Sequence, residues 1–372
     1  MTGRARLLHV FPTFGPGGTE LRMASIISGL GETFTHTIVP LNGQRGAADR
    51  ITRSIAIDFL DAPAGRGDLL YPLKLRRLIS SVQPDLLLTY NWGAIDAVLG
   101  CMIAPPCSIV HNECGFGPDE AAHLKRRRIW TRRIALRQVF RTIVVSRLLQ
   151  RVAHTRFGLS EDKVRFIQTG VDTERFTPGR NDELRQQWGL DADTVVFGFA
   201  GGLRGEKNLH LLLSAFREAM LPGHAHLVLV GDGPERGELE HFSAQLGLRD
   251  RVSFCGHVSD MSKAMRAFDA FVMSSRTEQT PNALLEAMAT GLPVIATNVG
   301  DCAALVGAAG ASFIVTPDDR AGYAAALQRL AASRDECRDL GALNRKRALA
   351  EFSKSRMIEE YRDVYEEALA KG

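Results

Sequence analysis

The segment AFVMSSRTEQTPNALLEAMATGLPVIAT, residues 270–297, decides the fold class of this 372-residue chain. It begins with a short apolar run, Ala270–Ser274, continues with apolar residues at helical spacing after Pro281, and ends in a second apolar run, Pro293–Thr297. A strand, a crossover helix and a second strand in this order form a βαβ unit with parallel strands. The segment therefore predicts an α/β protein with a parallel sheet.

The same alternation of short apolar runs and longer helix-like segments extends in both directions from this unit. The predicted strands, six in each half of the chain, are Leu7–Phe11, Thr37–Leu41, Ala56–Leu60, Asp85–Tyr90, Ser108–His111, Thr142–Ser146, Val195–Ala200, His226–Val230, Arg251–Cys255, Ala270–Ser274, Pro293–Thr297 and Ser312–Val315. Two such halves predict two doubly wound, Rossmann-like domains that face each other across a cleft. Ligands of such sheets bind beyond the carboxyl ends of the strands.

Glycine and proline mark the expected boundary between the halves, near Thr169–Arg185, where the apolar periodicity is interrupted. We place the domains at residues 1–170 and 171–353. The last segment, about residues 354–372, has apolar residues at helical spacing and predicts one amphipathic helix.

Composition and charge are those of an ordinary globular protein, with 45% apolar residues, 24% charged residues and a formal net charge of +4. The start of the chain is basic and the apolar run Leu7–Phe11 is too short for an export signal, so we expect a cytoplasmic protein. The six cysteines have no metal-binding spacing, and neither a metal site nor a disulfide framework is expected. No motif indicates nucleic-acid binding.

Two glycine-rich turns follow predicted strands and are suited to bind an anion. Gly17 and Gly18 precede a helix whose backbone N–H groups could contact a phosphate, although a plain strand-to-helix turn is an equal alternative. The second turn, Gly201–Lys207, contains Arg204 and Lys207, which offer a guanidinium fork and a point charge to a diphosphate. Neither turn has the dinucleotide or nucleoside-triphosphatase spacing of glycines, which disfavours a nicotinamide dehydrogenase.

A third candidate is the start of the helix in the segment quoted above. Thr280 is the predicted N-cap and Pro281 the first helical residue, so that the N–H groups near Asn282 and the helix dipole favour a negative charge. Glu278 and Glu286 flank this helix end. Eight residues of helix span roughly 12 Å, which is too far for a glycosidase pair of carboxylates. We expect phosphates between the two glutamates instead.

A basic segment, Lys125–Arg141, has no acidic residue nearby. Such a helix could bind an anionic membrane surface or a phosphorylated, lipid-linked acceptor. The alternative is a solvated helix that packs on the first domain.

These motifs, in this order, resemble those of glycosyltransferase family 4, the retaining GT-B enzymes. The most specific resemblance is the pair Glu278 and Glu286 with seven residues between them. Supporting motifs are Gly17-Gly18, Gly170-Val171-Asp172 followed by Arg175-Phe176, Gly201 to Lys207, and Leu229-Val230-Gly231-Asp232-Gly233-Pro234. The resemblance covers the chain from its first predicted strand to its final helix.

The resemblance implies a metal-independent hexosyl transfer from a UDP- or GDP-linked sugar to a glycan, glycolipid or other acceptor in bacterial-type polysaccharide or glycoconjugate biosynthesis, with no cofactor. The N-terminal domain, completed by the last helix, would bind the acceptor, and the C-terminal domain the donor. The family pattern assigns Lys207 to the diphosphate, Glu286 to the ribose and Glu278 to the transferred sugar. It also places a phosphate at Thr280–Asn282. His111, at a strand end, would lie beside the donor sugar.

The sequence departs from the family pattern at two places in the expected site. Gly202 stands where the family has arginine, and Arg204 could supply that charge. Gln279-Thr280 replaces a common Gly-Phe, so the identity of the donor sugar cannot be inferred from the family. A sugar-nucleotide epimerase of the same architecture and a non-catalytic nucleotide-sugar-binding protein remain alternatives.

Overall fold

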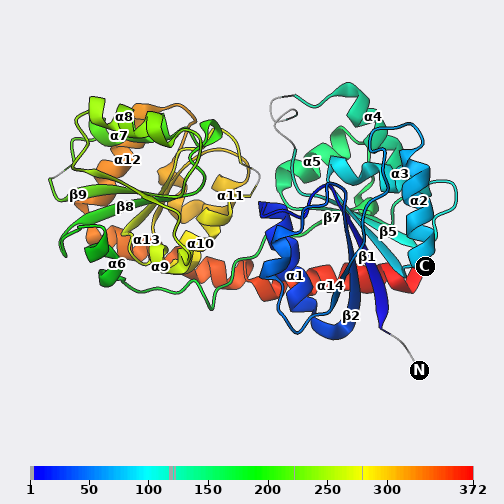
Figure 1. Cartoon of the computed structure of the whole chain (residues 1–372). Coiled ribbons are helices and arrows are strands. Elements are labelled where there is room, and N and C mark those ends of the chain that lie inside the picture. The colour runs from blue at the N-terminus through cyan, green and yellow to red at the C-terminus, as the bar shows by residue number, and fades with distance from the viewer. Residues whose placement is uncertain (1–3, 117–119, 121–122, 222, 279, 372) are drawn as a thin grey trace. The chain divides into compact units, whose positions relative to one another are not determined.

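The computed structural model describes residues 4–116, 120, 123–221, 223–278 and 280–371, and its chain forms two compact units (Figure 1). Unit 1 contains Met1–Gln168 and Ser355–Gly372, and unit 2 contains Thr169–Lys354. The chain thus enters unit 2 once and returns to unit 1 for its last helix. Each unit is built around its own parallel sheet with helices on both faces, which confirms the predicted class of two Rossmann-like domains.

The sheet of unit 1 has seven parallel strands in the order β3-β2-β1-β4-β5-β6-β7. Their bounds are β1 Ala5–Phe11, β2 Phe34–Pro40, β3 Ile57–Phe59, β4 Leu86–Tyr90, β5 Ser108–Glu113, β6 Arg141–Val144 and β7 Val164–Phe166. All six strands predicted for this half are present. The edge strand β7 was not predicted, and β5 continues two residues beyond the predicted end at His111.

Two apolar cores hold the helices of unit 1 against the two faces of its sheet. Helices α2 (Tyr71–Val82), α3 (Ile95–Cys101), α4 (Arg126–Ala135) and α5 (Arg147–Thr155) contribute to one core. Helices α1 (Gly18–Leu30) and α14 (Lys354–Lys371) contribute to the other. The apolar side of α14 is buried there, as its spacing predicted.

The sheet of unit 2 has six strands in the order β10-β9-β8-β11-β12-β13. Their bounds are β8 Val195–Ala200, β9 Ala225–Val230, β10 Val252–Gly256, β11 Ala270–Met273, β12 Val294–Thr297 and β13 Ile314–Val315. The helices are α6 Asp182–Gln187, α7 Leu209–Glu218, α8 Arg236–Gln245, α9 Met261–Met265, α10 Asn282–Thr290, α11 Cys302–Val306, α12 Arg320–Ala332 and α13 Arg334–Glu351. All six predicted strands are present.

The strand order of unit 2 reverses at β8, which pairs with β9 on one side and with β11 on the other. Chain segments that leave neighbouring parallel strands at such a point border a crevice where ligands bind. The segments after β8 and β11 are those that contain Arg204, Lys207 and Glu278.

Candidate functional site

The turn after β8 has a constrained backbone. A 3-10 turn at Gly205–Lys207 is followed by Asn208 in a left-handed conformation, with φ of 51°. The buried Asn208 side chain donates a hydrogen bond from Nδ2 to Asp318 Oδ1 at 3.0 Å. Asparagine tolerates this conformation better than most residues other than glycine, and its bond to Asp318 holds the end of the turn that presents Lys207.

Hydrogen bonds join this turn to the segment after β11. The Ser274 hydroxyl donates to the Lys207 carbonyl at 2.9 Å or to the Asn208 carbonyl at 3.1 Å. The Arg276 N–H donates to the Glu206 carbonyl at 2.8 Å. The two segments that the sequence assigned to one anion site therefore lie side by side in unit 2.

Lys207 and Glu278 contact each other directly. The Lys207 ammonium donates to Glu278 Oε1 at 2.5 Å, and the Ser275 hydroxyl donates to the same oxygen at 2.9 Å. Both side chains are only partly exposed, so the pair is less screened by solvent than a surface ion pair. An incoming diphosphate would compete with Glu278 for the ammonium.

The helix in the quoted segment begins one residue later than predicted. Pro281, with ψ of 113°, is the N-cap, and Asn282 is the first helical residue of α10. The prediction of Thr280 as N-cap was therefore wrong by one position. Proline is tolerated at the cap because it has no N–H to leave unpaired. The first turn of α10 has no side-chain cap, because the proline side chain has no hydrogen-bonding group. Gln279 lies outside the described residues.

Glu286 lies within α10, and its carboxyl group is largely removed from water. Burial raises the pKa of Glu286 to about 7, against the opposing effect of the Arg175 guanidinium. No hydrogen bond or ion pair of this carboxyl is present among the residues that the structure describes. A group of this kind, partly buried and without a protein partner, is suited to bind a ligand hydroxyl.

This raised pKa predicts a pH-dependent cost of Glu286 to stability. The folded protein holds the Glu286 proton more tightly than the unfolded chain, so the free energy of unfolding falls as pH rises from about 4.5 to about 7. The fall is at most about 3.5 kcal/mol. We expect Glu286→Gln to lack it, and to be more stable than the wild type at pH 8 but not at pH 5. Urea unfolding at both pH values measures this, and equal differences at both would contradict it.

The side chain of Arg204 lies over the backbone of Gly202. A Cβ atom built at Gly202 would be 3.3 Å from Arg204 Nε. Arg204 is itself exposed at the surface of unit 2. The guanidinium of Arg204 therefore occupies the space that a side chain at position 202 would enter.

The predicted residues of unit 1 lie at the carboxyl end of its own sheet. His111 is in β5, fully buried, and shares a hydrogen bond of 2.8 Å between its Nδ1 and the Thr89 hydroxyl. Its Nε2 is 3.7 Å from Glu113 Oε2. The prediction that His111 ends its strand was wrong, because Asn112 and Glu113 continue the pairing with β6. Its role beside a donor sugar stays a prediction.

Gly17 and Gly18 form the start of α1, where a side chain already provides a carboxylate. Gly18 is the first helical residue and Gly17 the N-cap. A Cβ at Gly17 would be 2.3 Å from Glu20 Oε2, so this carboxylate lies directly over the cap. Burial raises the pKa of Glu20. A phosphate at this helix end would have to displace the Glu20 carboxylate, and the anion site here also stays a prediction.

Sequence reasoning included Ser274 and Ser275 in the family motif without giving them a role, and it did not identify Asn208 or Asp318. Asp318 follows β13, and the only signal was its polar side chain beyond a strand that ends at the same edge of the sheet as β8 and β11. Its partner Asn208 is 110 residues away in sequence. Motif spacing holds no information on such a contact.

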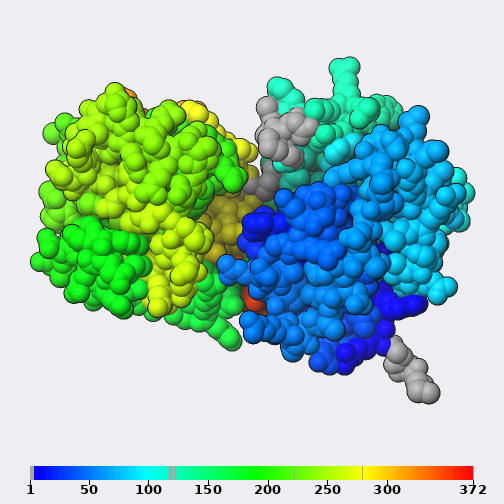
Figure 2. Space-filling model, viewed as in Figure 1, coloured from blue at the N-terminus to red at the C-terminus, as the bar shows by residue number. Residues whose placement is uncertain are grey.

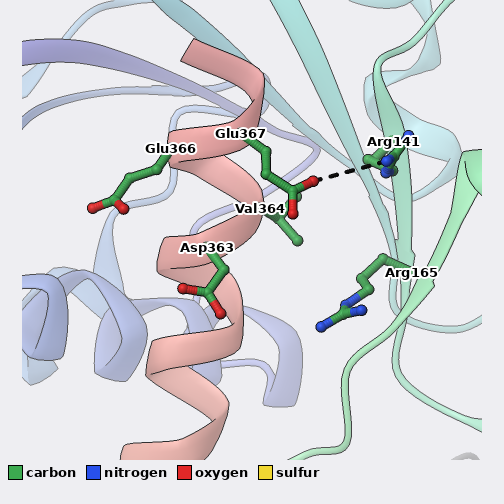
Figure 3. A pocket seen from close by; sticks show the side chains of 6 residues that line it. All are labelled: Arg141, Arg165, Asp363, Val364, Glu366 and Glu367. Carbon is green, nitrogen blue, oxygen red and sulfur yellow. Dashed lines mark ion pairs between the residues drawn. The ribbon is translucent and has the colours of Figure 1, made fainter. Parts of the chain in front are cut away.

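A pocket of about 370 Å³ in unit 1 is lined by two arginines and three acids (Figure 3). Arg141 and Arg165 approach it from β6 and β7, and the Glu367 carboxylate of α14 lies 3.8 Å from Arg141. Arg141 is the first residue of its strand. The pocket thus lies beside the amino end of β6, away from the edge where ligands of parallel sheets bind.

Within the part of the chain that the structure describes, no group of three or more histidine, cysteine, aspartate or glutamate residues is placed to hold a metal ion. Nor is any helix in that part long and apolar enough to cross a bilayer.

Both halves of this chain are similar to known proteins. Residues 16–175 match the family model described as Glycosyltransferase Family 4, and residues 194–333 match the model described as Glycosyl transferases group 1. The UDP-Gal:alpha-D-GlcNAc-diphosphoundecaprenol alpha-1,3-galactosyltransferase of Escherichia coli is 25% identical over 80% of this chain and 79% of its own length. A D-inositol 3-phosphate glycosyltransferase of Saccharomonospora viridis is 32% identical over 58% of this chain, but only 52% of that protein is matched.

A solved structure extends the likeness of fold to nearly the whole chain. HepE of Anabaena, in complex with UDP, superposes with a TM-score of 0.83 and 21% identity over 97% of this chain and all of that one. The fold is that of the GT-B glycosyltransferases. The chain belongs to glycosyltransferase family 4.

Proposed function

We propose that the protein transfers a hexosyl group from a nucleotide diphosphate sugar with retention of anomeric configuration and without a metal ion. The observation that supports this most directly is the ion pair between Lys207 and Glu278, which stands three residues before Pro281, the N-cap of α10. We favour UDP over GDP as the nucleotide. Uridine diphosphate is bound in the structure of HepE, and a UDP-sugar is named for the Escherichia coli relative.

The residues of unit 2 act on the charge that develops during transfer. The bond between the anomeric carbon and the phosphate oxygen breaks, and a bond to the acceptor oxygen forms on the same face. The acceptor proton passes to the departing phosphate oxygen, so that the products are a glycoside and a nucleoside diphosphate. Lys207, Arg204 and the N–H groups from Asn282 onward stabilise the negative leaving group. Glu286 binds the ribose, and Glu278 lies near the sugar.

We further propose that the acceptor is a glycan or a lipid-linked sugar in polysaccharide or glycoconjugate synthesis, and that transfer takes place at the cytoplasmic face of the membrane. Support comes from the diphosphoundecaprenol-linked acceptor in the name of the Escherichia coli relative. The basic segment Lys125–Arg141, which the sequence predicts to bind an anionic membrane or acceptor, contains α4 and the residues that follow this helix in unit 1.

A panel assay tests the proposed reaction. The protein is incubated with UDP- and GDP-linked sugars, with and without lipid-linked and glycan acceptors, and released nucleotide is measured in the presence and absence of a chelator. We expect release that requires an acceptor and survives chelation, with an α-configured product from an α-configured donor. Loss of activity with the chelator contradicts metal independence. Interconversion of donor sugars without an acceptor supports an epimerase instead, and binding without release supports a non-catalytic protein.

Arg204 should be replaceable by an arginine at position 202. We expect Arg204→Ala to lower kcat/KM for the donor by about 10- to 100-fold, because one charge-assisted contact to the diphosphate is lost. Adding Gly202→Arg should restore most of this loss, since the three atoms nearest to the new Cβ belong to the Arg204 side chain that has been removed. Arg334→Ala, at an exposed arginine of α13, is the control. Unchanged activity of Arg204→Ala, or a folded double variant that stays inactive, contradicts the assignment.

A further inference from the structure

Helix α4 of unit 1 has two different faces, and its inner face is fixed to the unit by ion pairs. Arg132 is fully buried and donates from Nε to Glu113 Oε2 at 2.8 Å. Arg128 donates to Glu120 Oε2 at 3.0 Å, and Arg132 Nη1 is 3.3 Å from the same oxygen. Both guanidinium groups also lie about 5 Å from the centre of the Trp92 ring. These two arginines are therefore used to hold the helix in place.

The outer face of α4 combines arginines with exposed apolar side chains. Trp130 is 62% exposed and Ile134 is 53% exposed. Arg126 and Arg127 are exposed one turn earlier, and neither has an ion pair with any residue that the structure describes. Spacings of three and four residues place these four side chains on one side of the helix. The Arg133 guanidinium lies 5.1 Å from the centre of the Trp130 ring.

The surroundings of this face are also basic. Arg137 follows the helix, Arg151 of α5 is exposed, and Arg133 Nε donates to the carbonyl of the exposed Arg156 at 2.7 Å. The sequence contains no aspartate or glutamate from His123 to Ser160. Figure 2 shows the segment of α4 at the surface of unit 1, at the top of the view. No acidic side chain of this segment offsets its charge.

Large exposed apolar side chains of unit 1 are confined to one layer of helices. Within the described residues they are Leu69, Leu70, Leu73, Ile103, Trp130 and Ile134. They belong to the start of α2, the loop after α3, and α4, and these three helices pack into the same core. An apolar residue in isolation needs no explanation, but Trp130 and Ile134 are neighbours on one side of α4 and lie among arginines.

We propose that the outer face of α4, formed by Arg126, Arg127, Trp130, Arg133, Ile134 and Arg137, docks on the surface of an anionic lipid bilayer. The arginines bind the lipid phosphates, while Trp130 and Ile134 enter the boundary between head groups and acyl chains. A soluble polyanion would use the arginines but would leave the tryptophan and isoleucine in water. The pairing of charge with exposed apolar surface thus favours a bilayer.

The fixed inner face makes this docking effective. Arg128 and Arg132 hold α4 before any lipid is bound, so little conformational entropy is lost on docking. This inference refines the membrane location proposed above, but it does not depend on the transfer reaction. Vesicle binding can fail while transfer to a soluble acceptor succeeds, and the reverse also holds.

Co-sedimentation of the full-length protein with vesicles tests the proposal. The vesicles contain phosphatidylcholine alone or phosphatidylcholine mixed with phosphatidylglycerol. We expect binding to the mixed vesicles only, weakened by salt, with a blue shift of tryptophan fluorescence that is absent in Trp130→Phe. Binding that does not depend on phosphatidylglycerol, or no binding to either vesicle, overturns the proposal.

Two double variants separate the charged from the apolar contribution. Arg126→Glu with Arg127→Glu, and Trp130→Ser with Ile134→Ser, should each weaken binding by roughly tenfold or more. The matched controls in unit 2 are Arg249→Glu with Arg334→Glu, at exposed arginines, and Leu343→Ser with Leu349→Ser, at half-exposed leucines of α13. All eight exchanged residues of these four double variants are exposed, and circular dichroism checks that each variant is folded.

If the variant Trp130→Ser with Ile134→Ser binds the mixed vesicles as well as the wild type does, the arginines alone account for binding, as they would for a soluble polyanion. That result would overturn the proposal that the partner is a bilayer. An equal loss in the unit 2 controls would show a nonspecific effect and would do the same. Retention of binding in the controls, with loss in both α4 variants, supports the proposal.

Discussion

Replacing Lys207 by alanine is expected to lower kcat by about 100- to 1,000-fold and to leave the protein folded. The ammonium is the cation held at the junction of the turn after β8 and the segment after β11. Removal of one preorganised group that stabilises transition-state charge typically has an effect of this size. The loss should fall mainly on kcat, because the charge on the leaving diphosphate grows as the bond breaks.

Initial rates of nucleotide release measure this effect at saturating donor and acceptor. Lys346→Ala is the matched control, since Lys346 is an exposed lysine of α13 with no role in the site. Glu278→Gln separates the two members of the ion pair. If Glu278 serves only to hold the lysine, its amide variant should bind donor at least as tightly as the wild type. Wild-type turnover of Lys207→Ala would refute the assignment of the site.

The fold could be predicted because parallel strands buried on both faces are short apolar runs separated by helical segments. This pattern failed at β7, whose three residues Val164–Phe166 have an arginine at the centre. The edge strand β3 is equally short, but it lies within the apolar run Ala56–Leu60, whereas β7 is preceded by Lys163. The pattern also failed at the end of β5, where Asn112 and Glu113 are polar yet buried. Their burial depends on partners from distant segments, such as Arg132 for Glu113.

The two loops of unit 2 were assigned to one anion site from the sequence, and the structure shows how they meet. Glycine turns and a proline before a helix are local features, so Gly201–Lys207 and the start of α10 could be located in the sequence. The Lys207–Glu278 ion pair joins residues 71 positions apart and follows from the adjacency of β8 and β11. Which pairs of loops become neighbours depends on strand order, and local spacing does not determine that order.

The second large effect is expected at Arg132, where Arg132→Met should lower the free energy of unfolding by about 3 to 5 kcal/mol. Methionine fills the space of the arginine stem but leaves the buried carboxylates of Glu113 and Glu120 without this cation. Burial tends to raise the pKa of Glu113, yet Arg132, together with His111, more than offsets this tendency and the pKa lies below its ordinary value. Without Arg132 the effect of burial dominates, and the carboxyl should hold a proton.

This reversal predicts how the loss depends on pH. In the wild type, the depressed pKa of Glu113 contributes stability above the unfolded pKa near 4.5, and this contribution is lost as pH falls. In Arg132→Met the raised pKa costs stability as pH rises, so the difference between the proteins should be largest at pH 7 and smaller at pH 5. Urea unfolding at both pH values measures it. Adding Glu113→Gln to Arg132→Met should recover part of the loss at pH 7. A loss that is the same at both pH values, with no recovery, would mean that packing rather than charge makes Arg132 necessary.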